Sequence, residues 1–408
     1  MLFSTQRCAL FLAAAIAFAS CAPSGSGSNV GALTPNGPAT VRSNGGMAPV
    51  VYVANEAGKP NGGTVTVYTQ TGKWLRTMHK GIKAPTAFAF DTAHNVYVLN
   101  APTAGGGSVA VYARGGKKFL GHIAAKAMKK PVGLVLDSKN NIYVLNAASP
   151  STGRGNVLVF KAGSTQLIAT IVKGISQPTD IASDCHGNVY VLNSKTVTAY
   201  GPKHKLNLTI RGMSAATGLM VTCAGTVYVA QSLVPPAMSA HISHSATPTP
   251  SSSPTTAPPT GLVTEYAAGS TTEMLTIQLS QTIPCGMAPN SDASMIWVMG
   301  CPAFTSTSTT MSMTAYMAGS GTPATTIDIG TTFDMFAFYR NPNVILQTTL
   351  AIPRVAPTSG ALAPHSGSSY AMQLAVYTIG YASGSISAYT IDAVDESTLG
   401  VPVAIASN

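Results

Sequence analysis

Short apolar runs with a central tyrosine recur along the chain, separated by segments rich in Gly, Asn and Pro. One phrase, Val/Ile-Tyr-Val followed by Leu or Ala and then an amide residue, occurs five times. Its copies are Val51–Asn55, Val96–Asn100, Ile142–Asn146, Val189–Asn193 and Val227–Gln231. The closing amides are 45, 46, 47 and 38 residues apart. A β-branched run of this length predicts a buried strand, and a period near 45 predicts a repeated supersecondary unit.

Further phrases place additional strands around each copy. A phrase such as Val65–Tyr68 follows it, and the last copy of this phrase is Ile386–Tyr389. A phrase such as Pro85–Asp91 precedes it, and fourth strands such as Leu167–Val172 complete the unit. Four antiparallel strands in a unit of this length, repeated in series, predict an all-β fold of the β-propeller class. We expect seven blades, with six or eight as alternatives.

The two ends of the repeated region predict how the ring closes. The first unit starts directly at its second strand, Val50–Val53. The chain ends in Val401–Asn408, which is similar to the first-strand phrase Gln177–Asp184. We therefore expect the carboxyl-terminal strand to pair with blade one, which removes an open sheet edge.

These phrases resemble the NHL- and YVTN-type propeller repeats, and Gly384–Asp392 is close to the YVTN pattern. The same broad group includes SMP-30-like gluconolactonases and six-phosphogluconolactonase-like proteins. The resemblance covers roughly residues 47–408, and it is clear in the first four units and weak from Ser232 onward. It implies the propeller fold and leaves the function open, because this fold hosts many activities.

Residues 1–21 have the pattern of a secretory signal peptide. A positive residue, Arg7, precedes an apolar run that is too short to span a bilayer permanently. The end of this segment, Phe18–Cys21, resembles the bacterial lipobox, although that motif usually has Leu where this chain has Phe18. The resemblance implies that Cys21 carries a lipid, and ordinary cleavage after Ala19 is the alternative.

Two segments have the composition of flexible chain. Residues 22–46 are rich in Ser, Gly, Pro and Asn and predict a linker between the signal and the propeller of residues 47–408. Residues 232–261 are almost entirely Ser, Thr, Pro and Ala and predict a disordered surface insertion. Together with the signal, they predict an exported protein anchored by lipid at the cell envelope. A secreted soluble protein is the alternative.

Charge is distributed unevenly along the chain. The net charge is +10, but residues 47–212 hold 19 Lys and Arg against 5 Asp and Glu, whereas residues 213–408 hold 2 against 8. The basic half either solvates outer strands and turns or faces an anionic surface such as phospholipid headgroups or an acidic polymer. Nucleic acid is not expected, because no aromatic stacking platform is interleaved with the lysines.

Four cysteines lie outside the signal region, and an even number in an exported chain favours disulfides. Cys285 and Cys301 fall on neighbouring antiparallel strands of the sixth unit, so we expect them to pair. Cys185 and Cys223 occupy matching turns of adjacent units, where bridging depends on how closely the turns approach.

The repeated polar residues have a functional and a structural interpretation. A ring of amides at one mouth of the channel would bind a ligand, whereas a residue repeated at every strand end normally satisfies backbone groups of a turn. The amides concerned are Asn55, Asn100, Asn146 and Asn193. The repetition favours the structural role for them, and also for the aspartates that open the turns after the first strands, Asp91, Asp137 and Asp184.

Catalytic motifs for nucleophilic triads, zinc proteases, phosphate loops and EF-hands are absent from the sequence. The gluconolactonase resemblance implies a divalent metal, and the weak candidates are Asp180 and Asp334, which with repeat amides would offer oxygen ligands to Ca²⁺ or another divalent ion. The low acidic content favours a monomeric, non-enzymatic binding module without a cofactor. Its partner would be a protein, a glycan or an anionic surface. The alternative is a metal-dependent lactonase-like hydrolase or lyase with its site in the channel.

Overall fold

The computed structural model describes most of the repeated region. The described residues are 50–56, 62–69, 74–102, 105–149, 151–233, 259–280, 282–289, 293–302, 311–330, 335–338, 344–351, 371–380, 385–391 and 401–407. They form an all-β structure with one short 3-10 turn, η2 (Arg114–Gly116). No helix within these ranges has the length and apolar character needed to cross a membrane.

Within the described residues, the strands assemble into seven four-stranded sheets in which every pair is antiparallel. The first four sheets comprise β28 (Val401–Ser407), β1 (Val50–Glu56), β2 (Thr64–Thr69) and β3 (Trp74–Met78); β4 (Pro85–Phe90), β5 (Val96–Asn100), β6 (Ser108–Tyr112) and β7 (Phe119–Ala124); β8 (Pro131–Leu136), β9 (Ile142–Asn146), β10 (Asn156–Phe160) and β11 (Leu167–Ile171); and β12 (Pro178–Ser183), β13 (Val189–Asn193), β14 (Thr196–Tyr200) and β15 (Leu206–Arg211). The remaining three comprise β16 (Ala216–Val221), β17 (Val227–Ser232), β18 (Pro259–Tyr266) and β19 (Glu273–Ser280); β20 (Thr282–Pro289), β21 (Met295–Pro302), β22 (Met311–Met317) and β23 (Pro323–Gly330); and β24 (Met335–Phe338), β25 (Val344–Ala351), β26 (Ala371–Gly380) and β27 (Ser385–Ile391).

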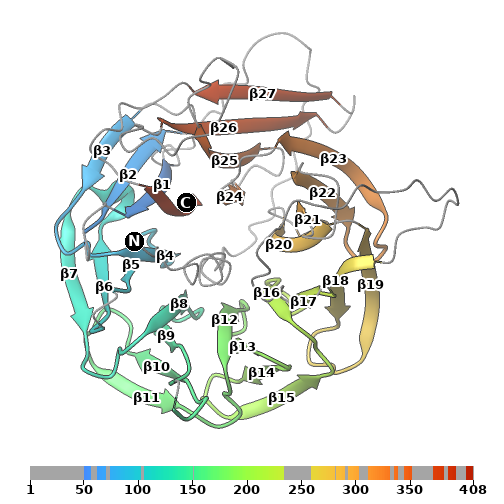
Figure 1. The fold of residues 1–408 in the computed structure, drawn as a ribbon. Coiled ribbons are helices and arrows are strands. Elements are labelled where there is room, and N and C mark those ends of the chain that lie inside the picture. The colour runs from blue at the N-terminus through green and yellow to red at the C-terminus, as the bar shows by residue number, and fades with distance from the viewer. Residues whose placement is uncertain are drawn as a thin grey trace, which may run out of the picture.

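The sheets follow one another around a common centre, with the first strand of each sheet innermost and the fourth outermost (Figure 1). β28, from the carboxyl end of the chain, takes the innermost place beside β1, and Val53 lies opposite Ile405 in their antiparallel register. Strands from the two ends of the chain are therefore neighbours in one sheet.

The second strand of each early sheet is buried on both faces, which explains its continuous apolar sequence. In β5, Val96 and Val98 pack into a core shared with the preceding sheet. The alternate residues Tyr97 and Leu99 pack into a core shared with the following sheet. Similar cores join the later neighbours, so side chains between the sheets, each worth roughly 1.5–3 kcal/mol when buried, hold the sheets together.

Two segments differ in detail from the sequence expectation. The last copy of the third-strand phrase, Ile386–Tyr389, lies in β27 at the edge of its sheet, because β26 occupies the third place. The predicted insertion 232–261 is narrower, since β17 extends to Ser232 and β18 begins at Pro259. Between them, residues 234–258 lie outside the described residues.

Alternating strand direction divides the connections between two sides of the molecule. We call one side the loop face: it carries the connections after second and fourth strands. These connections in the first sheets are residues 79–84, 101–107, 125–130, 147–155, 172–177, 194–195 and 212–215. We call the other side the turn face: it carries the hairpins after first and third strands. These hairpins are residues 91–95, 113–118, 137–141, 161–166, 184–188, 201–205, 222–226, 267–272 and 318–322.

Candidate binding face

The repeated asparagines bind the loops that connect neighbouring sheets on the loop face. Asn100, buried at the end of β5, accepts a hydrogen bond on Oδ1 from the backbone N–H of Lys83 (2.9 Å). Its Nδ2 donates to the carbonyl of Gly81 (2.8 Å) and to Oγ of Ser108 (3.0 Å). The amide therefore satisfies backbone groups that a tight connection would otherwise leave unpaired.

The next sheets repeat this arrangement, except that Oδ1 of Asn146 has no hydrogen-bond partner. Buried Asn146 donates to the carbonyl of Ala127 (2.9 Å). Buried Asn193 accepts from the N–H of Ser176 (2.9 Å) and donates to the carbonyl of Gly174 (3.3 Å). These amides bind the protein's own loops. They lie at the ends of second strands, each of which neighbours the innermost strand of its sheet. The geometry therefore assigns them to the fold rather than to a ligand ring.

Tyrosines of the third strands fasten the same loops a second time. Tyr112 donates its hydroxyl proton to the carbonyl of Lys80, and Tyr200 does so to the carbonyl of Lys173 (2.6 Å). Burial raises the pKa of Tyr112 to about 12, so this hydroxyl stays protonated and remains a donor at neutral pH. The loops 79–84 and 172–177 are thus each fixed by a buried amide and a tyrosine, whereas β10 ends in Phe160 and loop 125–130 has the amide bond from Asn146 without a tyrosine.

The connections of the loop face carry a row of exposed cations. These are Lys80, Lys83, Lys126, Lys129, Lys130, Arg154, Lys173 and Lys195, together with Arg211 at the end of β15. The connections of the loop face between Met78 and Ala216 contain no Asp or Glu. Among the described residues, no carboxylate forms an ion pair with these cations. Lys80 lies over the ring of Phe119, with Nζ 5.2 Å from the ring centroid.

Asp180 is the carboxylate that breaks the repeat on an innermost strand, β12. It follows an irregularity near the start of β12, at a position that the other first strands fill with a small residue. Those residues are Ala87, Gly133, Gly218 and Gly286. A Cβ on Gly133 would approach Ile181 of the following sheet to 2.6 Å, so this position points at the next sheet and has little room.

The Asp180 carboxylate joins two neighbouring sheets. Its Oδ2 accepts the N–H of Leu219 on β16 (3.0 Å), and its Oδ1 accepts the N–H of Ile181 (2.8 Å). β16 has a strand partner on one side only, so some of its amides lack a ladder partner and Asp180 satisfies one of them. Burial raises the pKa of Asp180 to about 7, and the two N–H bonds act in the opposite direction.

The described residues do not fit the divalent metal implied by the gluconolactonase resemblance. Both oxygens of Asp180 already accept backbone N–H groups, and the repeat amides are held by loops. In the described part of the chain, no three His, Cys, Asp or Glu side chains are grouped closely enough to hold a metal. The other candidate, Asp334, lies outside the described residues.

On the turn face, aspartates close the hairpins between first and second strands. Asp184 accepts the N–H groups of His186 (2.9 Å) and Asn188 (2.8 Å) on Oδ1. Its Oδ2 accepts Nδ2 of Asn188 (2.6 Å) and the hydroxyl of Tyr190 (3.2 Å). The same four bonds recur at Asp91 and Asp137. The expectation that these residues are turn formers is confirmed.

The fifth sheet in chain order uses a different acid for the same purpose. Its hairpin has Thr222 where the others have Asp, and the Tyr228 hydroxyl bonds to Glu265 instead. Glu265 is buried on β18 and also accepts the N–H of Gly319 in the next sheet (3.2 Å). This role of Glu265 was not predicted from the sequence, where its signal is the loss of Asp at position 222.

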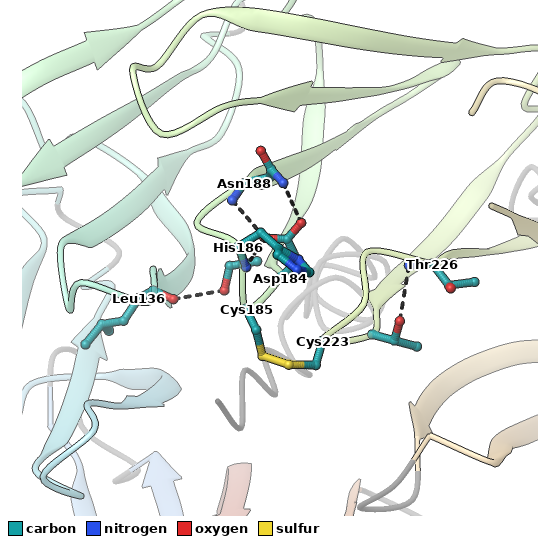
Figure 2. The surroundings of a disulfide bond; sticks show 9 residues. Leu136, Asp184, Cys185, His186, Asn188, Cys223 and Thr226 are labelled. Carbon is teal, nitrogen blue, oxygen red and sulfur yellow. Dashed lines mark hydrogen bonds between the residues drawn. A yellow bond between two sulfur atoms is a disulfide. The ribbon is translucent and has the colours of Figure 1, made fainter. Parts of the chain in front are cut away.

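A disulfide joins two turns of the turn face. Cys185, directly after Asp184, is bonded to Cys223 of the next sheet, with Cα atoms 4.7 Å apart (Figure 2). The backbone N–H of Cys185 also donates to the carbonyl of Cys223 (3.2 Å). The structure thus contains the Cys185–Cys223 disulfide, whose formation was expected to depend on how closely the two turns approach.

The remaining predicted positions are only partly described. Cys301 in β21 lies opposite Ile283, and Cys285 falls at an irregularity of β20, so their pairing stays a prediction. The backbone of Asn55 lies one residue before the end of β1, opposite Thr64. Cys21 lies outside the described residues.

Comparisons with known proteins bear on the fold. The chain matches no protein-family model and no curated protein. A protein from Lactobacillus plantarum is 15% identical, over 89% of this chain and 100% of that one, with a TM-score of 0.56. The WD40 domain of Pan2 from Neurospora crassa is 11% identical, over 74% of this chain and 82% of that one, with a TM-score of 0.51. WD40 domains are β-propellers, so the likeness shows a propeller-type fold alone.

Proposed function

We propose that this chain is an exported, lipid-anchored β-propeller that acts as a non-enzymatic binding module at the cell envelope, with the loop face as its working surface. The observation that carries the proposal is the row of exposed cations on the loop face, most of which lie on loops held by buried amides. A surface that is fixed before binding loses little conformational freedom when a partner docks. Its partners are a protein, a glycan or an anionic surface.

In this proposal, the propeller has seven blades and closes through its carboxyl-terminal strand. Support comes from the seven four-stranded sheets and from the pairing of β28 with β1. Closure in this way gives the inner edge of β1 a strand partner.

Export is supported by the Cys185–Cys223 disulfide, because such bonds persist in oxidising compartments. The anchor rests on the lipobox-like end of the signal segment. We expect the wild-type chain to take up radiolabelled palmitate in its bacterial host and to fractionate with membranes. The Cys21→Ser chain should do neither, and an unlabelled wild-type chain would refute the anchor.

A metal-dependent lactonase-like hydrolase is the alternative that an assay can separate. Elemental analysis of the purified chain before and after chelation measures bound divalent metal. A stoichiometric metal that leaves with the chelator, together with lactone hydrolysis that Asp180→Asn abolishes, would replace the binding proposal. Absence of both leaves the binding module as the better account.

A further inference from the structure

We infer that the loop face docks on an anionic phospholipid bilayer. This inference rests on the proposed binding function and names its partner. The cations come from the first four sheets in chain order, β28–β3, β4–β7, β8–β11 and β12–β15, which are consecutive around the centre (Figure 1). They therefore cover a broad sector of one side of the molecule rather than a single pocket.

On the connections of this sector between Met78 and Ala216, the charged side chains are all Lys or Arg. Each Lys or Arg close to an anionic membrane contributes about 1 kcal/mol to binding, so several together suffice for stable docking. The turn face differs, because Asp91, Asp137 and Asp184 lie among its lysines. The two faces thus offer a matched comparison within one chain.

The loop face also presents an exposed apolar side chain beside one of the cations and another in the following sheet. Val172, next to Lys173, is 62% exposed, and Leu233, directly after β17, is 40% exposed. Exposed aliphatic residues amid lysines suit an interface in which the apolar groups enter the headgroup region and the cations contact phosphates. A soluble polyanion would satisfy the lysines but not these side chains, which is why we commit to a bilayer.

The predicted tether allows this orientation. β1 begins at Val50, on the side where first-to-second-strand turns lie, so the predicted linker 22–46 joins the propeller on the turn face. Fully extended, a linker of that length spans about 80–90 Å. An anchor on Cys21 thus leaves either face free to meet the membrane, and the charge selects the loop face.

The experiment uses the full chain carrying Cys21→Ser, so that no acyl group contributes. Binding is measured by co-sedimentation with vesicles of phosphatidylcholine alone or mixed with phosphatidylglycerol. We expect binding to the mixed vesicles only, and its loss in about 0.5 M salt. Lys126→Glu/Lys129→Glu/Lys130→Glu should lower the partition coefficient by about 100-fold or more.

Two further variants separate the loop face from net charge. Lys118→Glu/Lys203→Glu/Lys205→Glu makes the same change in net charge with exposed lysines of the turn face, and should alter binding less than about fivefold. Val172→Ser keeps every charge and should weaken binding by up to about tenfold. Thermal melts of each variant check that it is folded.

Three results would overturn the inference: equal losses in the two triple variants, no vesicle binding by the Cys21→Ser chain, or binding to soluble polyphosphate but not to vesicles. The last would leave a binding module with a different partner. Palmitate labelling of the wild-type chain is independent of all three, so failure of the anchor and failure of the docking face are distinguishable.

Discussion

At the scale of single residues, the same polar side chain bonds the same backbone groups in successive sheets. Each aspartate of the first turns accepts N–H groups two and four residues ahead, which the sequence spacing alone predicts. The asparagines act over 17 to 19 residues, on loops before the preceding strand. Their partners could not be read from spacing, although repetition correctly indicated a structural device.

Asp180 predicts a pH dependence of stability. Burial raises its pKa to about 7, above the unfolded value of 3.8, so the folded chain binds more protons between those values. Stability from this group is therefore fully present below about pH 4 and is lost as pH rises through about 7. We expect the free energy of unfolding of the wild type in urea to fall from about pH 5 to pH 8, by an amount on the order of a few kcal/mol at most. The fall should be smaller in Asp180→Asn, which keeps an oxygen for Leu219.

The matched control for this prediction is Glu273→Gln, which neutralises an exposed carboxylate on the outermost strand β19. Its pH profile should overlay that of the wild type. If Glu273→Gln flattens the profile as much as Asp180→Asn does, the dependence arises elsewhere.

The hydrogen bonds of Asn100 predict how much one of these loop-binding asparagines contributes to the free energy of unfolding. Asn100→Ala leaves the N–H of Lys83 and the carbonyl of Gly81 without their partners, which should cost about 2–4 kcal/mol in urea unfolding. Asn100→Gln should cost less, because Gln231 performs the same task for Ser214 in a later sheet. An alanine variant within about 0.5 kcal/mol of the wild type would contradict this role.

At the scale of elements, the apolar sequence of a strand decides whether it is buried, whereas contacts between neighbouring sheets decide which polar side chains pair. Strands β5, β9 and β13 are buried along their whole length, as their apolar phrases predict. The hairpin at Thr222 departs from the Asp pattern, and Glu265 compensates from another strand. The sequence shows the loss of Asp at position 222, but it does not show that Glu265 compensates, because the two residues are far apart along the chain.

The Cys185–Cys223 disulfide predicts a loss of stability on removal. It closes a loop with a sequence separation of 38, for which chain entropy gives roughly 3–4 kcal/mol. Cys185→Ser/Cys223→Ser should lower the urea midpoint accordingly, and reductant should do the same to the wild type. A further drop when reductant is added to the double variant would report the predicted Cys285–Cys301 bond. An unchanged midpoint in the double variant would argue against any stabilising bridge between these turns.

At the scale of the whole molecule, the pairing of β28 with β1 brings the two ends of the repeated region together. In the proposed closed ring, every inner strand has neighbours in the sheets on both sides. The ring also gathers cations from separate units on one side, which neither net charge nor spacing alone reveals.

Closure predicts that the last strand matters more than its length suggests. Deleting residues 401–408 exposes the edge of β1 and should lower the melting temperature and promote self-association, seen by size-exclusion chromatography. Deleting the predicted linker 22–46 removes more residues and should leave the melting temperature unchanged. Equal stability of both truncated chains would contradict closure through β28.

The sequence by itself determined the strands, the antiparallel hairpins and the turn aspartates, because these depend on periodicity and on bonds between residues close in the chain. Tertiary structure alone decided that Asp180 meets Leu219, that Cys185 meets Cys223 and that the lysines of separate loops share one face. Those outcomes depend on how each sheet is set against the next. That arrangement arises from side-chain packing between residues far apart in sequence, and no local pattern records it.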